Sequence, residues 1–581
     1  MKRILGLLLC VALLVGMCGV LTGCGEADNK GAYISVSLAD VAFDLDPTEY
    51  NVSDNAAQIM SLIYEPLFTL NKRGKVKLAA AEEYEIDKEE RTIVITLRES
   101  YWSNGARVTA DDFIYAWRDR ILSPNRPNAA AALLYGIENA VEVKQGTADI
   151  NTFGAMRTGV YEITITYVEG ADPQQILKNL ASVATAPVYQ PTVSAAPETW
   201  SKTTATCTTN GPFRIAEYDT EGAFTLTRNE GYHQPTTAKK IDKYVRPWTL
   251  ATFWAGDEKV ELTYSQIENK VIFFMGNPTL ADRMENKKKA TVADALSTYT
   301  YVFNTENPLF ADAHVRYALS LALDRGAIAT AVTFGKAATG LLPDAMEKSF
   351  NVNGLSASAN LAKAQEELAK ANLSGIDKSF TLTVADNEES RAIAEIVKAN
   401  WAELGFTVTI DYAEKIHTVV TNAEGVVENE YDDDGIQKLI RDASYGIRNY
   451  DCIGIDLQMY STDPFVALCA FTSTMNGNGV VFSGETNTPV ARANIAGYVN
   501  ADYDKLMKDA MSATGKAREE LLRQAEALLI TDAPIVPVLF NQNGAYIAKQ
   551  LRKVTYDKFG NFIFTNAKLR SYEKYLPTEE E

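Results

Sequence analysis

Strand-like and helix-like segments alternate over several hundred residues, and this alternation constrains the fold more than any other feature of the chain. Short runs with the period of two expected of half-buried strands lie at 92–97, 161–166 and 406–410. Apolar residues recur at helical spacing at 311–323, 361–371, 390–404 and 517–529. Interleaved strands and helices predict an α/β architecture. In the second helix, Glu366 and Lys370 have the i,i+4 spacing of an exposed ion pair.

The chain length bounds the number of domains. With 581 residues, the chain is too long for one ordinary domain, and two or three are expected. The sequence contains no Pro/Gly/Ser-rich linker, low-complexity tract or internal repeat that would separate them. The domains are therefore expected to be continuous in space but not necessarily in sequence.

The N-terminus has the features of an export signal. Lys2 and Arg3 precede the apolar run 4–21, and small residues follow. The tetrapeptide Leu21-Thr22-Gly23-Cys24 resembles a bacterial lipobox and argues against the alternative of a membrane-spanning helix. It predicts a signal peptide at 1–23 and a polar tether at 24–29. Lipid, palmitate included, on the sulfur of Cys24 would anchor the chain to the outside of the cell membrane.

Charge and cysteine content narrow the possible partners. The formal net charge of −19 at pH 7 repels phosphate backbones and argues against nucleic-acid binding. After the signal and Cys24, three cysteines remain: Cys207, Cys452 and Cys469. The sequence leaves open a disulfide between Cys452 and Cys469 or buried free thiols.

No catalytic signature stands out. The chain has three histidines and neither an HExxH nor a GxSxG motif, and His314 is expected at a surface. The segment 477–479 lacks the third glycine of a dinucleotide-binding loop and predicts a flexible turn. Asp432-Asp433-Asp434 predicts a solvated acidic loop rather than a calcium site. We therefore predict no catalytic residue, cofactor or metal, although a secreted hydrolase that uses two carboxylates remains the rival class.

A series of motifs in fixed order carries a family resemblance. The motifs are Leu45-Asp46-Pro47, Tyr64-Glu65-Pro66-Leu67-Phe68, Trp102-Ser103-Asn104-Gly105, Thr109-Ala110-Asp111-Asp112-Phe113, Asn210-Gly211-Pro212-Phe213, Phe303-Asn304-Thr305, Ala322-Leu323-Asp324-Arg325 and Ala533-Pro534-Ile535-Val536-Pro537. Together they resemble the family 5 extracellular solute-binding proteins, which include the oligopeptide- and dipeptide-binding proteins of ABC importers. The weakest match lies between residues 250 and 289.

Some of these motifs also have a structural explanation. Thr109 is expected to cap a helix that carries acidic residues in its first turn. The aromatic side chains of Trp102, Phe113 and Trp117 are expected in the core. Val315, Leu319 and Ala322 share one helical face and should be buried as well.

The resemblance implies a two-lobed α/β fold of the periplasmic-binding-protein type II, with an extra domain on the first lobe. Lobe I would comprise residues 30–60, 205–300 and 533–581. The extra domain would comprise residues 61–204, and lobe II residues 301–532. Because the chain crosses repeatedly between the lobes, hinge closure over a ligand is expected.

The resemblance also implies a function. The chain would be a monomeric substrate-binding lipoprotein that captures a peptide-like solute and delivers it to the membrane subunits of an ABC importer. A peptide-sensing receptor and a metal-chelate binder of the same fold are the alternatives.

Site residues follow from the same resemblance. The segment Leu457-Gln458-Met459-Tyr460 precedes a turn that ends in Pro464, where relatives grip the ligand. Relatives often have tryptophan where this chain has Leu457, and an aspartate for the peptide amine where it has Tyr460. The loop residues Tyr50, Asn51 and Ser53 should face the same cleft, and Ala129 matches a pocket tyrosine of some relatives. A free amine is therefore expected to matter less here, unless Asp456 or Asp463 supplies the missing charge.

Overall fold

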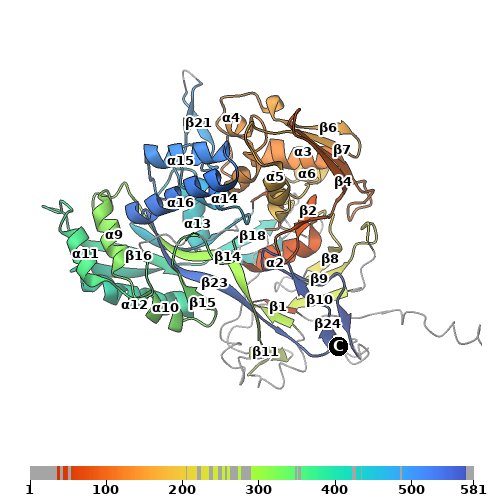
Figure 1. Cartoon of the computed structure of the whole chain (residues 1–581). Helices are drawn as coiled ribbons and strands as arrows, with labels where there is room; N and C mark the ends of the chain where they lie inside the picture. Colours follow the sequence, from red (N-terminus) through yellow and green to blue (C-terminus); the bar gives the residue numbers. More distant parts are fainter. Residues whose placement is uncertain are drawn as a thin grey trace, which may run out of the picture.

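The computed structural model describes residues 36–38, 44–49, 54–203, 206–218, 224–234, 240–245, 252–255, 258–261, 273–275, 290–346, 350, 355–421, 425, 427–433, 435–484 and 487–570 (Figure 1). The predicted signal peptide, tether and Cys24 lie outside these residues, as do Tyr50, Asn51 and Ser53. Within the described part, no helix has both the length and the apolar character needed to cross a membrane.

A large mixed sheet runs through the molecule and confirms the α/β class. It contains eleven described strands. Their order is β17 (Thr407–Ala413), β16 (Ser379–Ala385), β20 (Cys452–Gln458), β14 (Ala290–Phe303), β23 (Ile535–Ile547), β13 (Phe273–Met275), β1 (Val36–Leu38), β10 (Lys240–Val245), β9 (Phe224–Arg228) and β8 (Phe213–Tyr218), with β15 (Gly335–Ala337) also paired to β23.

Strands β14 and β23 form the centre of this sheet and lie side by side through the middle of the molecule (Figure 1). They pair antiparallel from Ala290 opposite Tyr546 to Val302 opposite Ile535. Their register shifts twice, between Asp294 and Thr298 and between Tyr299 and Thr300. From Ser297 to Phe303, β14 also pairs with β20, whereas β23 pairs at its other end with β13. The pair thus connects the two halves of the sheet.

Helices α9 (Ala313–Leu321), α10 (Arg325–Thr330), α11 (Leu361–Leu368) and α12 (Glu388–Ala402) lie with β16 and β17 around one apolar cluster. Trp401 is fully buried there, contacts the rings of Tyr301 and Phe380, and donates its indole N–H to Leu319 O at 2.9 Å. Val315, Leu319 and Ala322 are buried, as predicted.

The predicted ion pair in α11 is wrong, because Lys370 pairs with Glu367 at 2.8 Å and not with Glu366. Lys370 lies beyond the last residue of α11, so the i,i+4 spacing of a continuing helix does not apply. Glu367 also contacts His314, whose Nδ1 lies 2.9 Å from Glu367 Oε2. The side chain of His314 is half-exposed and lies at the surface, as expected.

A second, four-stranded sheet has the order β4 (Ala81–Asp87), β5 (Thr92–Leu97), β7 (Glu162–Thr166) and β6 (Ala155–Gly159). Helix α3 (Ala110–Ile114) begins after Thr109, whose hydroxyl and N–H both donate to Asp112, and it continues into a π-helix, Tyr115–Ile121. Trp102, Phe113 and Trp117 are buried as predicted. Short helices complete this region: α2 (Asp54–Ile63), α4 (Ala140–Lys144), α5 (Pro173–Asn179) and α6 (Gln190–Ala195).

The chain contains four further helices: α13 (Gly435–Ser444), α14 (Pro464–Cys469), α15 (Ala501–Met511) and α16 (Gly515–Asp532). Of these, α14 to α16 lie toward the four-stranded sheet (Figure 1). The apolar cluster of that sheet includes side chains of α14 to α16, such as Phe465, Tyr503 and Leu522. The remaining strands form antiparallel pairs: β2 (Phe68–Leu70) with β3 (Val76–Leu78), β11 (Thr252–Ala255) with β12 (Glu258–Glu261), β18 (Ile416–Thr421) with β19 (Val427–Asp433), β21 (Val480–Phe482) with β22 (Pro489–Ala491), β24 (Leu551–Arg552) with β27 (Lys568–Leu569), and β25 (Thr555–Tyr556) with β26 (Phe562–Ile563).

The structure corrects two local predictions and shows whether the three cysteines form a disulfide. Asp432 and Asp433 belong to strand β19 rather than to a loop, because they pair with β18. The segment 477–479 is not a free turn, because its glycines pack against backbone atoms of the 124–129 segment. Cys207, Cys452 and Cys469 are all buried free thiols.

Candidate functional site

The segment 457–460, at the end of β20 and just after it, separates two cavities. Gln458, Met459 and Tyr460 line both of them. One, the apolar cavity, encloses about 1030 Å³, with its opening to solvent included, and lies between β20, α13, α14 and the residues 127–129. The other, the polar cavity, encloses about 960 Å³ and is lined by α2, residues 181–183 and the C-terminal residues 557–565. Three of the four predicted residues of this segment thus border both cavities, and Leu457 borders the apolar one.

The backbone of this segment is held in place on both sides. Met459 N–H donates to Leu296 O at 2.8 Å, which continues the pairing of β20 with β14. The buried Ser461 hydroxyl donates to Asn179 at 2.7 Å, a contact with the end of α5. Burial raises the pKa of Tyr460 above its usual range, so its phenol stays neutral at physiological pH.

The two neighbouring aspartates have different roles. Asp463 is buried, accepts the N–H of Phe465 as the N-cap of α14, and forms a two-pronged ion pair with Arg518 at 2.8 and 2.9 Å. Asp456 instead lies exposed on the wall of the apolar cavity and accepts a hydrogen bond from Asn541 at 2.6 Å. Because a carboxylate accepts several hydrogen bonds, Asp456 can take another donor, whereas Asp463 is committed to Arg518.

Acidic groups also border the polar cavity. Glu65 accepts the hydroxyl of Tyr232 and contacts His233 Nε2 at 2.6 Å. Burial raises the pKa of Asp557 to about 6, although Asn561 and nearby backbone N–H groups hydrogen-bond to its carboxylate. Among the described residues, the linings of the two cavities contain carboxylates but no lysine or arginine. The two cavities therefore favour a cationic or neutral guest over an anionic one.

Several lining residues were missed by the sequence analysis. Glu65 belongs to a family motif but was not identified as a lining residue. Asp557 comes from the C-terminal segment, and this segment is brought to α2 by Gln58, which donates to Phe562 O at 2.7 Å and accepts the Phe562 N–H. No local pattern signals that contact, because its partners are 504 residues apart. Ala129 lines the apolar cavity together with Leu457 and Tyr460.

The described residues contain no group of three or more His, Cys, Asp or Glu side chains placed to hold a metal ion. The chain matches the family model described as bacterial extracellular solute-binding proteins, family 5 Middle, over residues 75–433. The chain belongs to this family. Family 5 consists of substrate-binding proteins rather than enzymes, and this finding does not favour the hydrolase alternative.

Relatives match this family 5 protein over most of their length. It is 28% identical to the dipeptide-binding protein DppE of Bacillus subtilis, over 88% of this chain and 87% of the relative. It is 26% identical to the oligopeptide-binding protein OppA of the same organism, over 97% of this chain and 98% of the relative.

Solved structures support the fold. The murein tripeptide-binding protein MppA of Escherichia coli aligns with a TM-score of 0.72 at 21% identity, covering 92% of this chain and 98% of MppA. The pheromone receptor PrgZ aligns with a TM-score of 0.73 at 20% identity, covering 93% of this chain and all of PrgZ. These likenesses confirm the two-lobed α/β solute-binding fold of this family 5 protein.

Proposed function

We propose that this protein captures a peptide in an interlobe cleft and delivers it to the membrane subunits of an ABC importer. The observation that carries the proposal is the match over nearly the full length to relatives named as dipeptide- and oligopeptide-binding proteins. The position of residues 457–460 between two cavities supports it, since this segment is where the family resemblance places the ligand.

The lobes that would close over the peptide are those predicted from the sequence: 30–60, 205–300 and 533–581 for lobe I, 61–204 for the extra domain, and 301–532 for lobe II. In this proposal, β14 crosses from lobe I to lobe II, and the chain returns to lobe I just before its partner β23. Their two register shifts lie near the crossing, where a few backbone torsions could change on closure.

The chemistry of the two cavities suggests what the peptide presents to each. The apolar cavity, with Ile440, Val466 and Phe471 in its lining, suits an apolar side chain. The polar cavity offers hydroxyl and amide groups such as those of Ser61, Asn543 and Asn561, which suit a peptide backbone. Tyr50, Asn51 and Ser53 are proposed to complete the cleft.

The protein is proposed to act outside the cell membrane, held there by lipid on Cys24, as a monomer. The anchored protein with its captured peptide would then reach the importer by diffusing along the membrane surface.

Mass spectrometry of protein extracted from its native membrane tests both proposals. The denatured chain is expected to lack residues 1–23 and to carry acyl chains on Cys24. The native protein is expected to carry an extra mass that fragments as a peptide. An unmodified N-terminus would contradict the anchor, and a non-peptide ligand would contradict the substrate class.

A further inference from the structure

Two loops from distant parts of the chain meet beside the apolar cavity. Residues 123–129, here named the cleft loop, follow the π-helix of the extra domain, and residues 477–480, the glycine loop, lead into β21 of lobe II. Asn128 N–H donates to Gly477 O at 2.7 Å, and Val480 N–H donates to Pro124 O at 2.8 Å. These two backbone hydrogen bonds join segments that are about 350 residues apart in the sequence.

Only glycine permits this approach. A Cβ atom on Gly477 would lie 2.3 Å from Asn128 O, and one on Gly479 would lie 2.2 Å from Pro124 O. Both glycines also have positive φ, 86° and 67°, where other residues are strained. The atoms in the way are backbone carbonyl oxygens, and Pro124 O is itself an acceptor in the contact, so no side chain can move aside to make room.

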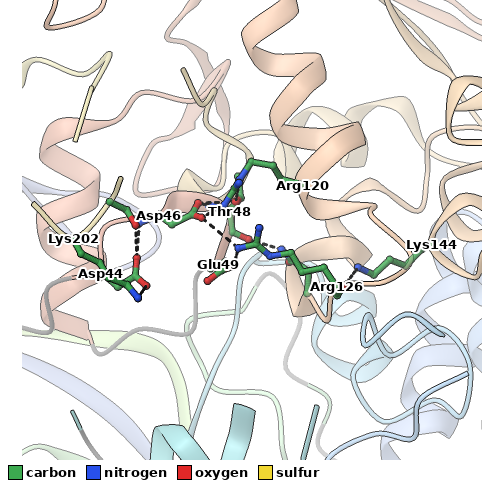
Figure 2. Close-up of polar contacts among 10 residues, drawn as sticks. Asp44, Asp46, Thr48, Glu49, Arg120, Arg126, Lys144 and Lys202 are labelled. Atoms are coloured by element: carbon green, nitrogen blue, oxygen red, sulfur yellow. Dashed lines mark hydrogen bonds and ion pairs between the residues drawn. The ribbon is translucent and has the colours of Figure 1, made fainter. Parts of the chain in front are cut away.

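The side chain of Lys144 holds the cleft loop in place (Figure 2). The buried ammonium group of Lys144 donates to Ile121 O at 2.8 Å, to Ser123 O at 3.0 Å and to Arg126 O at 2.6 Å. Burial lowers the pKa of Lys144 well below its usual range, and the nearby Arg126 and Arg492 add to this shift. The three carbonyl oxygens take the place of water around the ammonium group. The side chain thereby joins Ile121, just before the cleft loop, to Ser123 and Arg126 within it.

The same loop is fastened to the 44–49 segment of lobe I. The buried Asp46 forms an ion pair with Arg120 and lies 3.6 Å from Arg126, which also contacts Glu49 (Figure 2). Asn128 donates its side-chain amide to Thr48 O at 2.5 Å. The cleft loop is thus fixed to lobe I and to its own domain by side chains, while two backbone hydrogen bonds join it to the glycine loop.

Both loops belong to the wall of the apolar cavity. Asn128 and Ala129 line it from one side, and Asn476 and Asn478, which flank Gly477, line it from the other. Separation of the two loops would open this wall. The cavity is therefore complete only while the two backbone hydrogen bonds are made.

We propose that the cleft loop and the glycine loop form a latch that completes the wall of the ligand cavity, with Gly477 and Gly479 as the residues that permit contact and Lys144 as a positioning residue. The latch rests on the proposed function only for the role of the cavity. Its formation is a property of the chain whatever the ligand is.

Amide hydrogen exchange of the full chain without ligand tests the latch directly. In Gly477→Ala and Gly479→Ala, the amides of Asn128 and Val480 should exchange about tenfold faster or more than in the unmodified protein, because their acceptors move away. Gly446→Ala and Gly515→Ala are the matched controls. Their φ values are 94° and 57°, and an added Cβ at either position would meet nothing within 4 Å. The controls should leave both amides protected.

Equal acceleration in variants and controls, or none in either, would overturn the latch. Amides of the four-stranded sheet, such as those of Ile163 and Ile165, report whether the fold survives. If they too lose protection in the glycine variants, Lys144→Met decides. This variant is expected to speed exchange at Asn128 and Val480 while the sheet stays protected, and unchanged exchange at both positions would overturn the proposal. Because no peptide is used, failure here would leave the proposed function standing.

Discussion

The charged side chains of this molecule include buried groups that hold the fold and an exposed carboxylate at the cavity wall. Asp46, Asp463 and Lys144 are buried and fully engaged with partners on other elements. Asp456 lies exposed at the cavity wall. This distinction could not be drawn from the sequence, in which Asp456 and Asp463 both lie near Tyr460.

A free peptide amine is expected to contribute little to affinity, because the family resemblance sets the neutral Tyr460 in the place of the acidic anchor and Asp463 is committed to Arg518. Calorimetry should compare a binding peptide with its N-acetylated form, and we expect less than about a tenfold difference in Kd. A loss of a hundredfold or more on acetylation would contradict this expectation. If Asp456→Asn then removed the preference, Asp456 would be the partner of the amine.

Glu526 is expected to make stability depend on pH. Its carboxyl group is fully buried and accepts the N–H groups of Leu341 and Leu342, and burial raises its pKa to about 7. The folded chain therefore binds more protons than the unfolded chain between the usual glutamate pKa of about 4.3 and pH 7, so ionisation of Glu526 lowers stability as pH rises through this window.

Glu526→Gln keeps an acceptor for both N–H groups but cannot ionise. Urea unfolding of the two proteins should show that the variant gains stability relative to the unmodified chain as pH rises from about 4 to 7, by on the order of 3 kcal/mol. A difference between the two that does not change with pH would show that Glu526 keeps an ordinary pKa.

At the scale of elements, the sequence predicted those whose pattern is local. The period-two run 92–97 coincides with β5, and the predicted helix 390–404 overlaps α12 (Glu388–Ala402). The central pairing of β14 with β23 was not predicted, since its partners lie more than two hundred residues apart and a mixed pattern such as Ala290–Phe303 does not identify its neighbour. The contact between the cleft loop and the glycine loop was missed for the same reason. A glycine in the sequence predicts a turn, but it does not identify the segment that packs against that turn.

Helix α14 is expected to depend on the ion pair at its start. Asp463→Asn keeps the capping oxygen but leaves the largely buried Arg518 guanidinium without its carboxylate. The free energy of unfolding should fall by about 3 kcal/mol. The double variant Asp463→Asn/Arg518→Met should recover part of this loss, because no unpaired charge remains.

Glu520→Gln is the matched control on α16, since Glu520 pairs with Arg523 at an exposed position and should contribute little. If Asp463→Asn were as mild as this control, the Asp463–Arg518 pair would not be a main support of α14.

At the scale of the whole molecule, the fold class and the family could be predicted because their markers are spread along the chain. The cleft could be predicted only in part. The segment 457–460 was identified, whereas Glu65 and Asp557 were not, since this cavity collects residues from many separate stretches of sequence between Ala57 and Thr565. The charge of its lining, and with it the kind of guest favoured, becomes visible only in three dimensions.

The central claim is that this family 5 protein binds peptides and does not cleave them. The most direct measurement is to incubate the purified protein with a synthetic library of short peptides, follow its melting temperature, and recover the library by mass spectrometry. We predict a rise in melting temperature with every peptide recovered intact, since a ligand at a hundredfold excess over Kd stabilises the folded state by about 2.7 kcal/mol. An unchanged melting temperature, or peptide fragments that accumulate with time, would contradict the account.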